Sequence, residues 1–183
     1  MEDMIKFLEY IRKLKRTPRA GWQMLGIKNL ESVADHSFGT ALMGMVYSDI
    51  KKLDTERVLR MSLLHDFAES ITGDIPHPDK VKMGLEVAQE KENFALKKIL
   101  SLLPEELKSE YLDIWEDFEN KNSVESKLVR QIDRLEISSQ SLDYIKKIKK
   151  GKAERLSEMW EFVEKDINDP DLLKLLKSLK REK

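Results

Sequence analysis

The chain has 183 residues, of which 40% are hydrophobic, and this is enough to form one domain with a sizeable core. Its 33 lysines and arginines nearly balance 34 aspartates and glutamates, and a net charge of −1 argues against an extended basic surface for duplex nucleic acid. The absence of cysteine excludes disulfides and thiolate metal ligands, and it agrees with a reducing, cytoplasmic location.

No segment has the pattern of a signal peptide or of a membrane span. Residues 1–16 are amphipathic and charged, without an unbroken apolar core. The longest uncharged apolar-rich run, FGTALMGMVYS at residues 38–48, is too short to cross a bilayer. We therefore expect no membrane partner.

Apolar residues at helical spacing predict helices along the N-terminal part of the chain. The first helix carries apolar positions from Met4 to Leu14, and the proline and glycines of residues 16–27 predict a loop after it. Ser32 with Asp35 forms a capping-box pattern that starts a second helix. A third helix, capped by Asp54 or Thr55, is predicted to continue through Ser70 and to stop at Gly73.

The C-terminal part of the chain is also predicted to be helical. A proline-rich turn at residues 74–79 precedes a long helix, about 80–103, and Pro104 opens the next helix at its first turn. Ser123 starts a helix that runs through Tyr144 and is closed by Gly151. Two more helices occupy about residues 152–181. With no alternating run that indicates a strand, we predict an all-α, single-domain helical bundle over residues 1–183.

The stretch LLHDFAESITGD, residues 63–74, places four ionisable side chains within an apolar run: His65, Asp66, Glu69 and Asp74. Such groups are costly to bury unless something compensates them. A divalent metal ion would do so, because imidazole and carboxylate together suit Mn, Co, Fe or Zn. Neighbouring helix positions point about 100° apart, so a second helix must supply further ligands.

His36 and Asp133 are the candidates for the remaining ligands. Asp133 interrupts an apolar stripe, and His36 lies early in the second predicted helix. Each residue alone also has a structural interpretation, as a hydrogen-bonded histidine or a surface aspartate. The order H…HD…D on three helices, each in an apolar setting, favours a metal centre. His77, which lies between two prolines, is predicted to be an ordinary loop residue.

These residues resemble the H…HD…D signature of the HD-domain metal-dependent phosphohydrolases. Four blocks resemble the 5′-deoxynucleotidase branch of that family and occur in the same order: residues 14–22 (LKRTPRAGW), 31–37 (ESVADHS), 65–75 (HDFAESITGDI) and 129–136 (VRQIDRLE). The motif-bearing part spans about residues 14–144. Asp35 stands where the family has a glutamate, a departure that keeps the charge.

The resemblance implies an HD-domain helical fold and hydrolysis of deoxyribonucleoside 5′-monophosphates to deoxynucleoside and phosphate. It also implies one divalent metal ion, which we expect to be Mn, Co, Mg, Fe or Zn. By the same resemblance, Glu69 and Asp74 are the acid and base, in an order that the sequence does not decide. Their alternative interpretation is a solvated helix-end glutamate and a turn-forming aspartate.

The substrate is expected at the loop before the second helix. Arg19 has the planar guanidinium that suits a phosphate group. Trp22 is predicted to pack against the sugar or base and, by resemblance, to crowd a 2′-hydroxyl; its alternative interpretation is a buried anchor for the loop. A homodimer is expected because the family is often dimeric, and Trp115 and Trp160 suit an interface as well as a core.

Two other classes of function stay open. One is a different HD-type phosphohydrolase, acting on nucleoside triphosphates, cyclic dinucleotides or alarmones. Three histidines and no second metal-binding pair argue against a two-metal phosphodiesterase. The other is a non-catalytic helical binding module stabilised by metal, against which the presence of both Glu69 and Asp74 argues.

Overall fold

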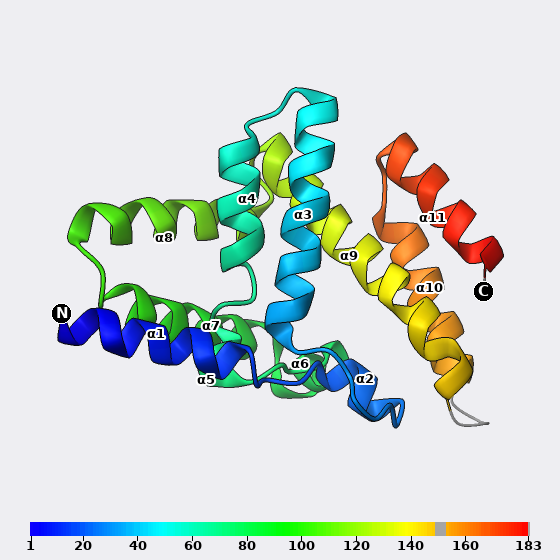
Figure 1. Cartoon of the computed structure of the whole chain (residues 1–183), viewed down its shortest axis with the longest axis horizontal. Coiled ribbons are helices and arrows are strands. Elements are labelled where there is room, and N and C mark those ends of the chain that lie inside the picture. The colour runs from blue at the N-terminus through cyan, green and yellow to red at the C-terminus, as the bar shows by residue number, and fades with distance from the viewer. Residues whose placement is uncertain (149–152, 183) are drawn as a thin grey trace.

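The computed structural model describes residues 1–148 and 153–182, which form helices joined by short loops (Figure 1). Within these ranges the extended pairing is limited to an isolated antiparallel bridge between Pro18 and Ser32. The predicted all-α fold is therefore confirmed. No helix in the described part of the chain is long and apolar enough to cross a membrane.

Three helices that pack on one another form the centre of the molecule: α3 (Val33–Lys51), α4 (Thr55–Leu64) and α9 (Val124–Tyr144). Two glycines of α3 permit the close approach. A Cβ atom on Gly44 would lie 2.9 Å from Val58 Cγ1 of α4, and one on Gly39 would lie 2.8 Å from Glu136 Oε1 of α9. A larger residue at Gly44 would push α3 and α4 apart, and one at Gly39 would displace the Glu136 side chain.

The other helices surround this centre. Helix α8 packs on α4 and α9, α10 and α11 pack on α9, and α7 contacts α5, α6 and α8, while α1 lies along α5. Their bounds are α1 (Glu2–Leu14), α2 (Ala20–Met24), α5 (Glu69–Thr72), α6 (His77–Met83), α7 (Leu85–Leu100), α8 (Glu105–Asn120), the 3-10 turn η1 (Ile145–Lys147), α10 (Ala153–Asp166) and α11 (Pro170–Glu182).

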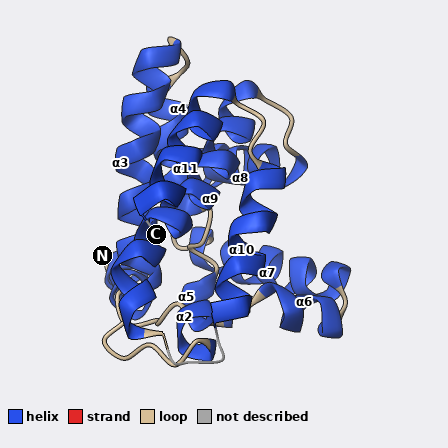
Figure 2. Ribbon diagram, turned by 90° about the vertical axis from the view of Figure 1, so that its right-hand side faces the viewer, coloured by secondary structure: helices blue, strands red, loops and turns tan. Residues whose placement is uncertain are grey.

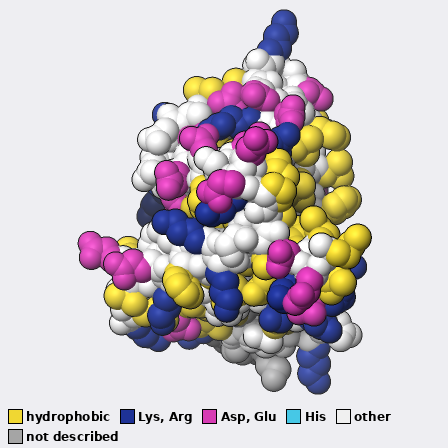
Figure 3. All heavy atoms as spheres, turned by 90° about the vertical axis from the view of Figure 1, so that its left-hand side faces the viewer, with side chains coloured by type: hydrophobic (Ala, Val, Ile, Leu, Met, Phe, Trp, Pro, Cys, Tyr) yellow, Lys and Arg dark blue, Asp and Glu magenta, His cyan; other side chains and the backbone are white. Residues whose placement is uncertain are grey.

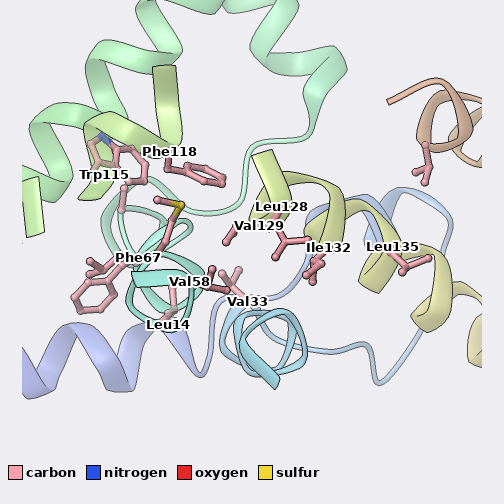
Figure 4. Packing of buried hydrophobic residues seen from close by; sticks show 14 of the residues in the cluster. Leu14, Val33, Val58, Phe67, Trp115, Phe118, Leu128, Val129, Ile132 and Leu135 are labelled. Atoms are coloured by element: carbon pink, nitrogen blue, oxygen red, sulfur yellow. The ribbon is translucent and has the colours of Figure 1, made fainter. Parts of the chain in front are cut away.

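The core lies where these helices meet (Figure 4). Val33, Val58 and Ile132 are fully buried there. Trp115 and Trp160 are 3% and 1% exposed, so both belong to the core of this chain. The indole N–H of Trp160 donates to Ser141 Oγ at 3.1 Å, which satisfies its buried polar atom.

The helix starts predicted at Ser32, Asp54 and Ser123 are confirmed. Ser32 Oγ accepts from the Asp35 amide at 3.2 Å while Asp35 Oδ2 accepts from the Ser32 amide at 2.9 Å, so the capping box is complete. Asp54 caps α4 and Ser123 caps α9. Pro104 is the N-cap of α8, one position before the first turn where it was expected.

The third predicted helix is not continuous. Helix α4 ends at Leu64, and α5 begins only at Glu69. Between them the backbone hydrogen bonds change from the i−4 to the i−3 carbonyl, for example from the Phe67 amide to the Leu64 oxygen at 3.0 Å. Apolar spacing did not reveal this break, because Leu64 before it and Phe67 within it are both buried.

Other boundaries also differ from the prediction. Gly84, with a φ of 96°, divides the expected helix of residues 80–103 into α6 and α7. Residues 16–27 were predicted to be a loop but contain the short helix α2. His77 is the first residue of α6 and not a loop residue. Helix α9 ends at Tyr144, and Gly151, predicted to close it, lies outside the described residues.

Candidate metal centre

Three of the four predicted metal ligands, His36, His65 and Asp66, form one group although they are far apart in sequence, and the fourth, Asp133, contacts His36. His36 comes from the start of α3, His65 and Asp66 from the break after α4, and Asp133 from the middle of α9. His36 Nε2 is 3.4 Å from His65 Nε2 and 3.1 Å from Asp133 Oδ1. Asp66 Oδ2 is 3.3 Å from His65 Nε2 and 3.7 Å from His36 Nε2. Metal–ligand bonds of about 2.0–2.2 Å put neighbouring ligand atoms at separations of about 3–3.5 Å.

Both imidazoles are held so that Nε2 faces the other ligands. His36 Nδ1–H donates to Glu136 Oε2 at 2.6 Å, and His65 Nδ1–H donates to the Ser62 carbonyl at 2.7 Å. Such outer partners fix the tautomer and orientation of metal-binding histidines. The sequence reasoning missed Glu136. Its available signal was a carboxylate one helical turn after Asp133, within the same apolar stripe.

The charge of the cluster suits a cation. Burial raises the pKa of Asp66 and of Asp133, but interactions with neighbouring groups lower both pKa values below the ordinary range. These groups are chiefly His65 for Asp66 and Arg134 for Asp133. Burial and Arg19 lower the pKa of His36, yet Asp133 and Glu136 raise it to about 9. Two ionised, buried carboxylates beside two imidazoles fit a divalent metal ion, whose charge compensates them.

The predicted catalytic and phosphate-binding residues border this cluster. Arg19 Nη1 donates to Asp66 Oδ2 at 3.1 Å and lies 4.0 Å from Asp74 Oδ2. The Ala20 amide donates to Asp74 Oδ2 at 2.7 Å. Glu69 is 5% exposed, and its Oε2 has no hydrogen-bond partner among the described residues. Burial, Asp66 and Asp74 raise the pKa of Glu69 well above its ordinary value, and burial also raises the pKa of Asp74.

Trp22 has a different environment from the one expected for a substrate contact. It is 4% exposed, its indole N–H donates to Glu31 Oε1 at 2.7 Å, and its ring meets Tyr144 edge-on at 5.2 Å. The Tyr144 hydroxyl in turn accepts from the Glu31 amide at 2.9 Å. Trp22 therefore anchors the loop between α1 and α3, and its contribution to sugar selection stays a prediction.

His36, His65 and Asp66 offer ligand atoms within 4.8 Å of one another, and Asp133 reaches His36. With an arginine and two carboxyl groups of raised pKa beside them, this arrangement suits a metal-dependent hydrolase centre in an all-α fold. A family model described as HD domain matches residues 11–173. The chain belongs to the HD domain family, and the resemblance inferred from its motifs is confirmed.

Individual relatives agree with the family. The chain is 37% identical over 183 residues to 5′-deoxynucleotidase HDDC2 of Danio rerio, covering 100% of this chain and 89% of that protein. It is 35% identical to 5′-deoxynucleotidase HDDC2 of Homo sapiens, covering 99% and 86%. The crystal structure of PH0347 protein from Pyrococcus horikoshii OT3 is similar with a TM-score of 0.81 at 30% identity, covering 98% and 99%.

Proposed function

We propose that this protein hydrolyses deoxyribonucleoside 5′-monophosphates to deoxynucleoside and phosphate. The observation that carries the proposal is the set of contacts that His36 makes with His65 and Asp133 and that His65 makes with Asp66, from three parts of the fold. The Arg19 guanidinium donates a hydrogen bond to Asp66 beside them. The names of the relatives support the substrate class. These four residues are proposed to hold one divalent ion, which is Mn, Co, Mg, Fe or Zn.

When bound, such an ion supplies a water nucleophile at neutral pH and polarises the phosphoryl oxygens. The chain itself supplies the rest. Arg19 donates from Nη1 to Asp66 Oδ2, and the guanidinium has further N–H donors that can bind the oxygens of a phosphate group. Glu69 and Asp74 are proposed to move the two protons of the reaction, one from the attacking water and one to the departing 5′-oxygen.

The alternative functions are separated by one screen. Phosphate release is measured over deoxy- and ribonucleoside mono-, di- and triphosphates, each with Mn, Co, Mg and Zn. Turnover of deoxynucleoside monophosphates above all others supports the proposal. A preference for di- or triphosphates would indicate a different HD-type phosphohydrolase, and cyclic dinucleotides, which release no phosphate, are tested by chromatography of the linear product. No turnover of any of them with metal bound would indicate a binding module.

Sugar selection gives a prediction for Trp22 and Arg19. Trp22→Ala is expected to narrow the preference for dAMP over AMP and to weaken binding of both nucleotides. The reason is that it removes the indole that anchors the loop between α1 and α3, where the substrate is expected. Trp22→Phe keeps an aromatic ring but loses the donor to Glu31 and part of the indole volume. Arg19→Ala is expected to raise KM for both nucleotides alike. The measurement is kcat and KM for dAMP and for AMP, with the wild type and with each variant.

Arg12→Ala, a substitution on the exposed side of α1, serves as the control for loss of an arginine. If the wild-type enzyme cleaves AMP and dAMP equally well, the steric role of Trp22 is wrong.

We further propose a homodimer, which an exposed apolar row on α3 supports. Phe38, Leu42, Val46 and Ile50 recur at every fourth position and are 46–67% exposed. Residues 36–48 contain no Asp, Glu, Lys or Arg, although 37% of the chain is charged. Hydrophobic side chains gather at the right of Figure 3, which is the side of α1 and α3 that faces the viewer in Figure 1. Contiguous apolar surface of this kind is typical of interfaces.

A second copy of the chain suits this row. With α3 antiparallel to its twin, Phe38 lies opposite Ile50 and Leu42 opposite Val46, so one surface pairs with itself. The same arrangement brings Asp35 of one copy near Lys52 of the other. Both residues are exposed, Asp35 before the apolar row and Lys52 after it. Opposite charges thus meet at both ends of the pair.

Leu42→Glu is therefore expected to convert dimers to monomers, because it buries two charges at the centre of the pairing. Light scattering after size-exclusion chromatography measures the mass. Leu107→Glu, at an exposed leucine of α8, is the control. A wild-type monomer at micromolar concentration, or an unchanged mass for Leu42→Glu, would rule out this interface.

A further inference from the structure

A row of three stacked side chains leads away from the metal centre. Arg134 Nη1 lies 3.3 Å from Asp133 Oδ2, and the Arg134 guanidinium carbon lies 5.3 Å from the ring centroid of Phe162. The Phe162 ring is stacked with the His77 ring, with centroids 6.1 Å apart and planes at 28°. The row therefore connects α9, α10 and α6, three elements far apart in sequence.

The fold places this row beside the candidate active site. Arg134 follows a proposed metal ligand, and His77 lies three residues after Asp74, which borders the cluster. Helix α10 overlaps α7 in the view of Figure 2, and the stacking of Phe162 on His77 shows that α10 and α6 are neighbours. One end of the row thus starts at a proposed metal ligand, Asp133, and the other end is exposed to solvent.

The two rings are exposed, unlike other aromatic residues of this region. Phe162 is 48% exposed and His77 is also exposed, whereas Trp22, Phe67 and Phe118 are at most 5% exposed. Arg134 is held by an Nε–H donation to Asp166 Oδ2 at 3.2 Å. A half-exposed phenylalanine next to a fixed guanidinium and an imidazole presents π-surface that the core does not use.

We propose that Phe162 and His77, supported by Arg134, form the platform on which the nucleobase lies while the 5′-phosphate is at the metal centre. This inference rests on the proposed nucleotidase function and deepens it. Aromatic rings and a guanidinium stack with any base, because every base has a π-face. The platform therefore predicts a broad tolerance of bases, with larger purines favoured over pyrimidines, and it gives α10 a role in substrate binding.

The test compares a nucleotide with the same sugar phosphate that lacks a base. Phe162→Ala and His77→Ala are each expected to raise KM for dAMP by about 5- to 100-fold, the range for loss of one base–aromatic stack. Hydrolysis of 2-deoxyribose 5-phosphate should stay within about twofold of wild type, because this substrate has no base to stack. Phe162→Trp keeps the ring and should retain the low KM.

Phe94→Ala is the matched control, since Phe94 is an exposed phenylalanine of α7, 71% exposed, outside the row. Circular dichroism and thermal unfolding show whether each variant is folded. Equal losses on dAMP and on deoxyribose phosphate would mean that the row only supports Asp133, and this would overturn the platform. Unchanged KM for dAMP in both alanine variants would overturn it as well.

A binding measurement separates this inference from the proposed function. Deoxyadenosine carries the base and has no phosphate to hydrolyse, so calorimetry reports its affinity without turnover. Its affinity should fall by about 5- to 100-fold in Phe162→Ala and stay unchanged in Phe94→Ala. If wild type releases no phosphate from any nucleotide but this dependence holds, the nucleotidase proposal fails and the base platform stands. If turnover is found without this dependence, the platform alone fails.

Discussion

Asp133→Ala is expected to lose metal and phosphohydrolase activity together. Asp133 Oδ1 lies 3.1 Å from His36 Nε2, and its carboxylate supplies half of the negative charge that the proposed ligand set offers. Changes in groups that only orient metal ligands already cost about 10- to 100-fold in affinity or activity. We therefore expect metal affinity to fall by more than about 100-fold. Elemental analysis and calorimetric titration with Mn or Zn measure this loss directly.

Two further variants make the result interpretable. Asp133→Asn keeps the shape of the side chain beside Arg134 and removes its charge, so it serves where the alanine variant does not fold. Asp143→Ala removes an exposed aspartate from the same helix, α9, and should bind metal as wild type does. Full metal occupancy in both Asp133 variants would reject this ligand set.

The candidate ligands could be predicted because ionisable residues are conspicuous in apolar segments. Burial of His65, Asp66 or Asp133 without a partner is costly, so their positions in the sequence already indicated a common partner. The helix starts were predicted for a similar reason, because Ser32, Asp54 and Ser123 satisfy amides that the helix itself leaves unpaired.

Other features depend on contacts between distant segments and left weaker signals. The break at His65 keeps the apolar spacing on both sides, so periodicity did not reveal it. Gly84 was readable as a glycine, but its positive φ is a property of the folded chain. The role of Glu136 follows from its distance of 2.6 Å to His36 in the folded chain. The role of Phe162 follows from the packing of α10 beside His77. Nothing in the local sequence of α10 indicates a substrate contact.

Glu69→Gln and Asp74→Asn are each expected to lower kcat by about 10²- to 10⁴-fold while metal and nucleotide still bind. Both changes keep the side-chain shape and leave the four proposed ligands in place. Glu69 is 5% exposed and its pKa is raised well above the ordinary value by burial and by Asp66 and Asp74. A carboxyl group that keeps its proton at higher pH is suited to protonate the departing 5′-oxygen. Asp74, held by the Ala20 amide at 2.7 Å, is suited to be its partner.

The pH profile distinguishes a proton-transfer role from a structural one. If protonated Glu69 is the acid, wild-type kcat should fall as pH rises through its raised pKa, because the active form is the protonated one. That decline should be absent from the residual activity of Glu69→Gln, since glutamine does not titrate. Glu86→Gln, at an exposed glutamate in the first turn of α7, should keep the wild-type rate and profile. Wild-type turnover in both Glu69→Gln and Asp74→Asn, with metal bound, would show that the pair is structural and that the protons are moved by other groups.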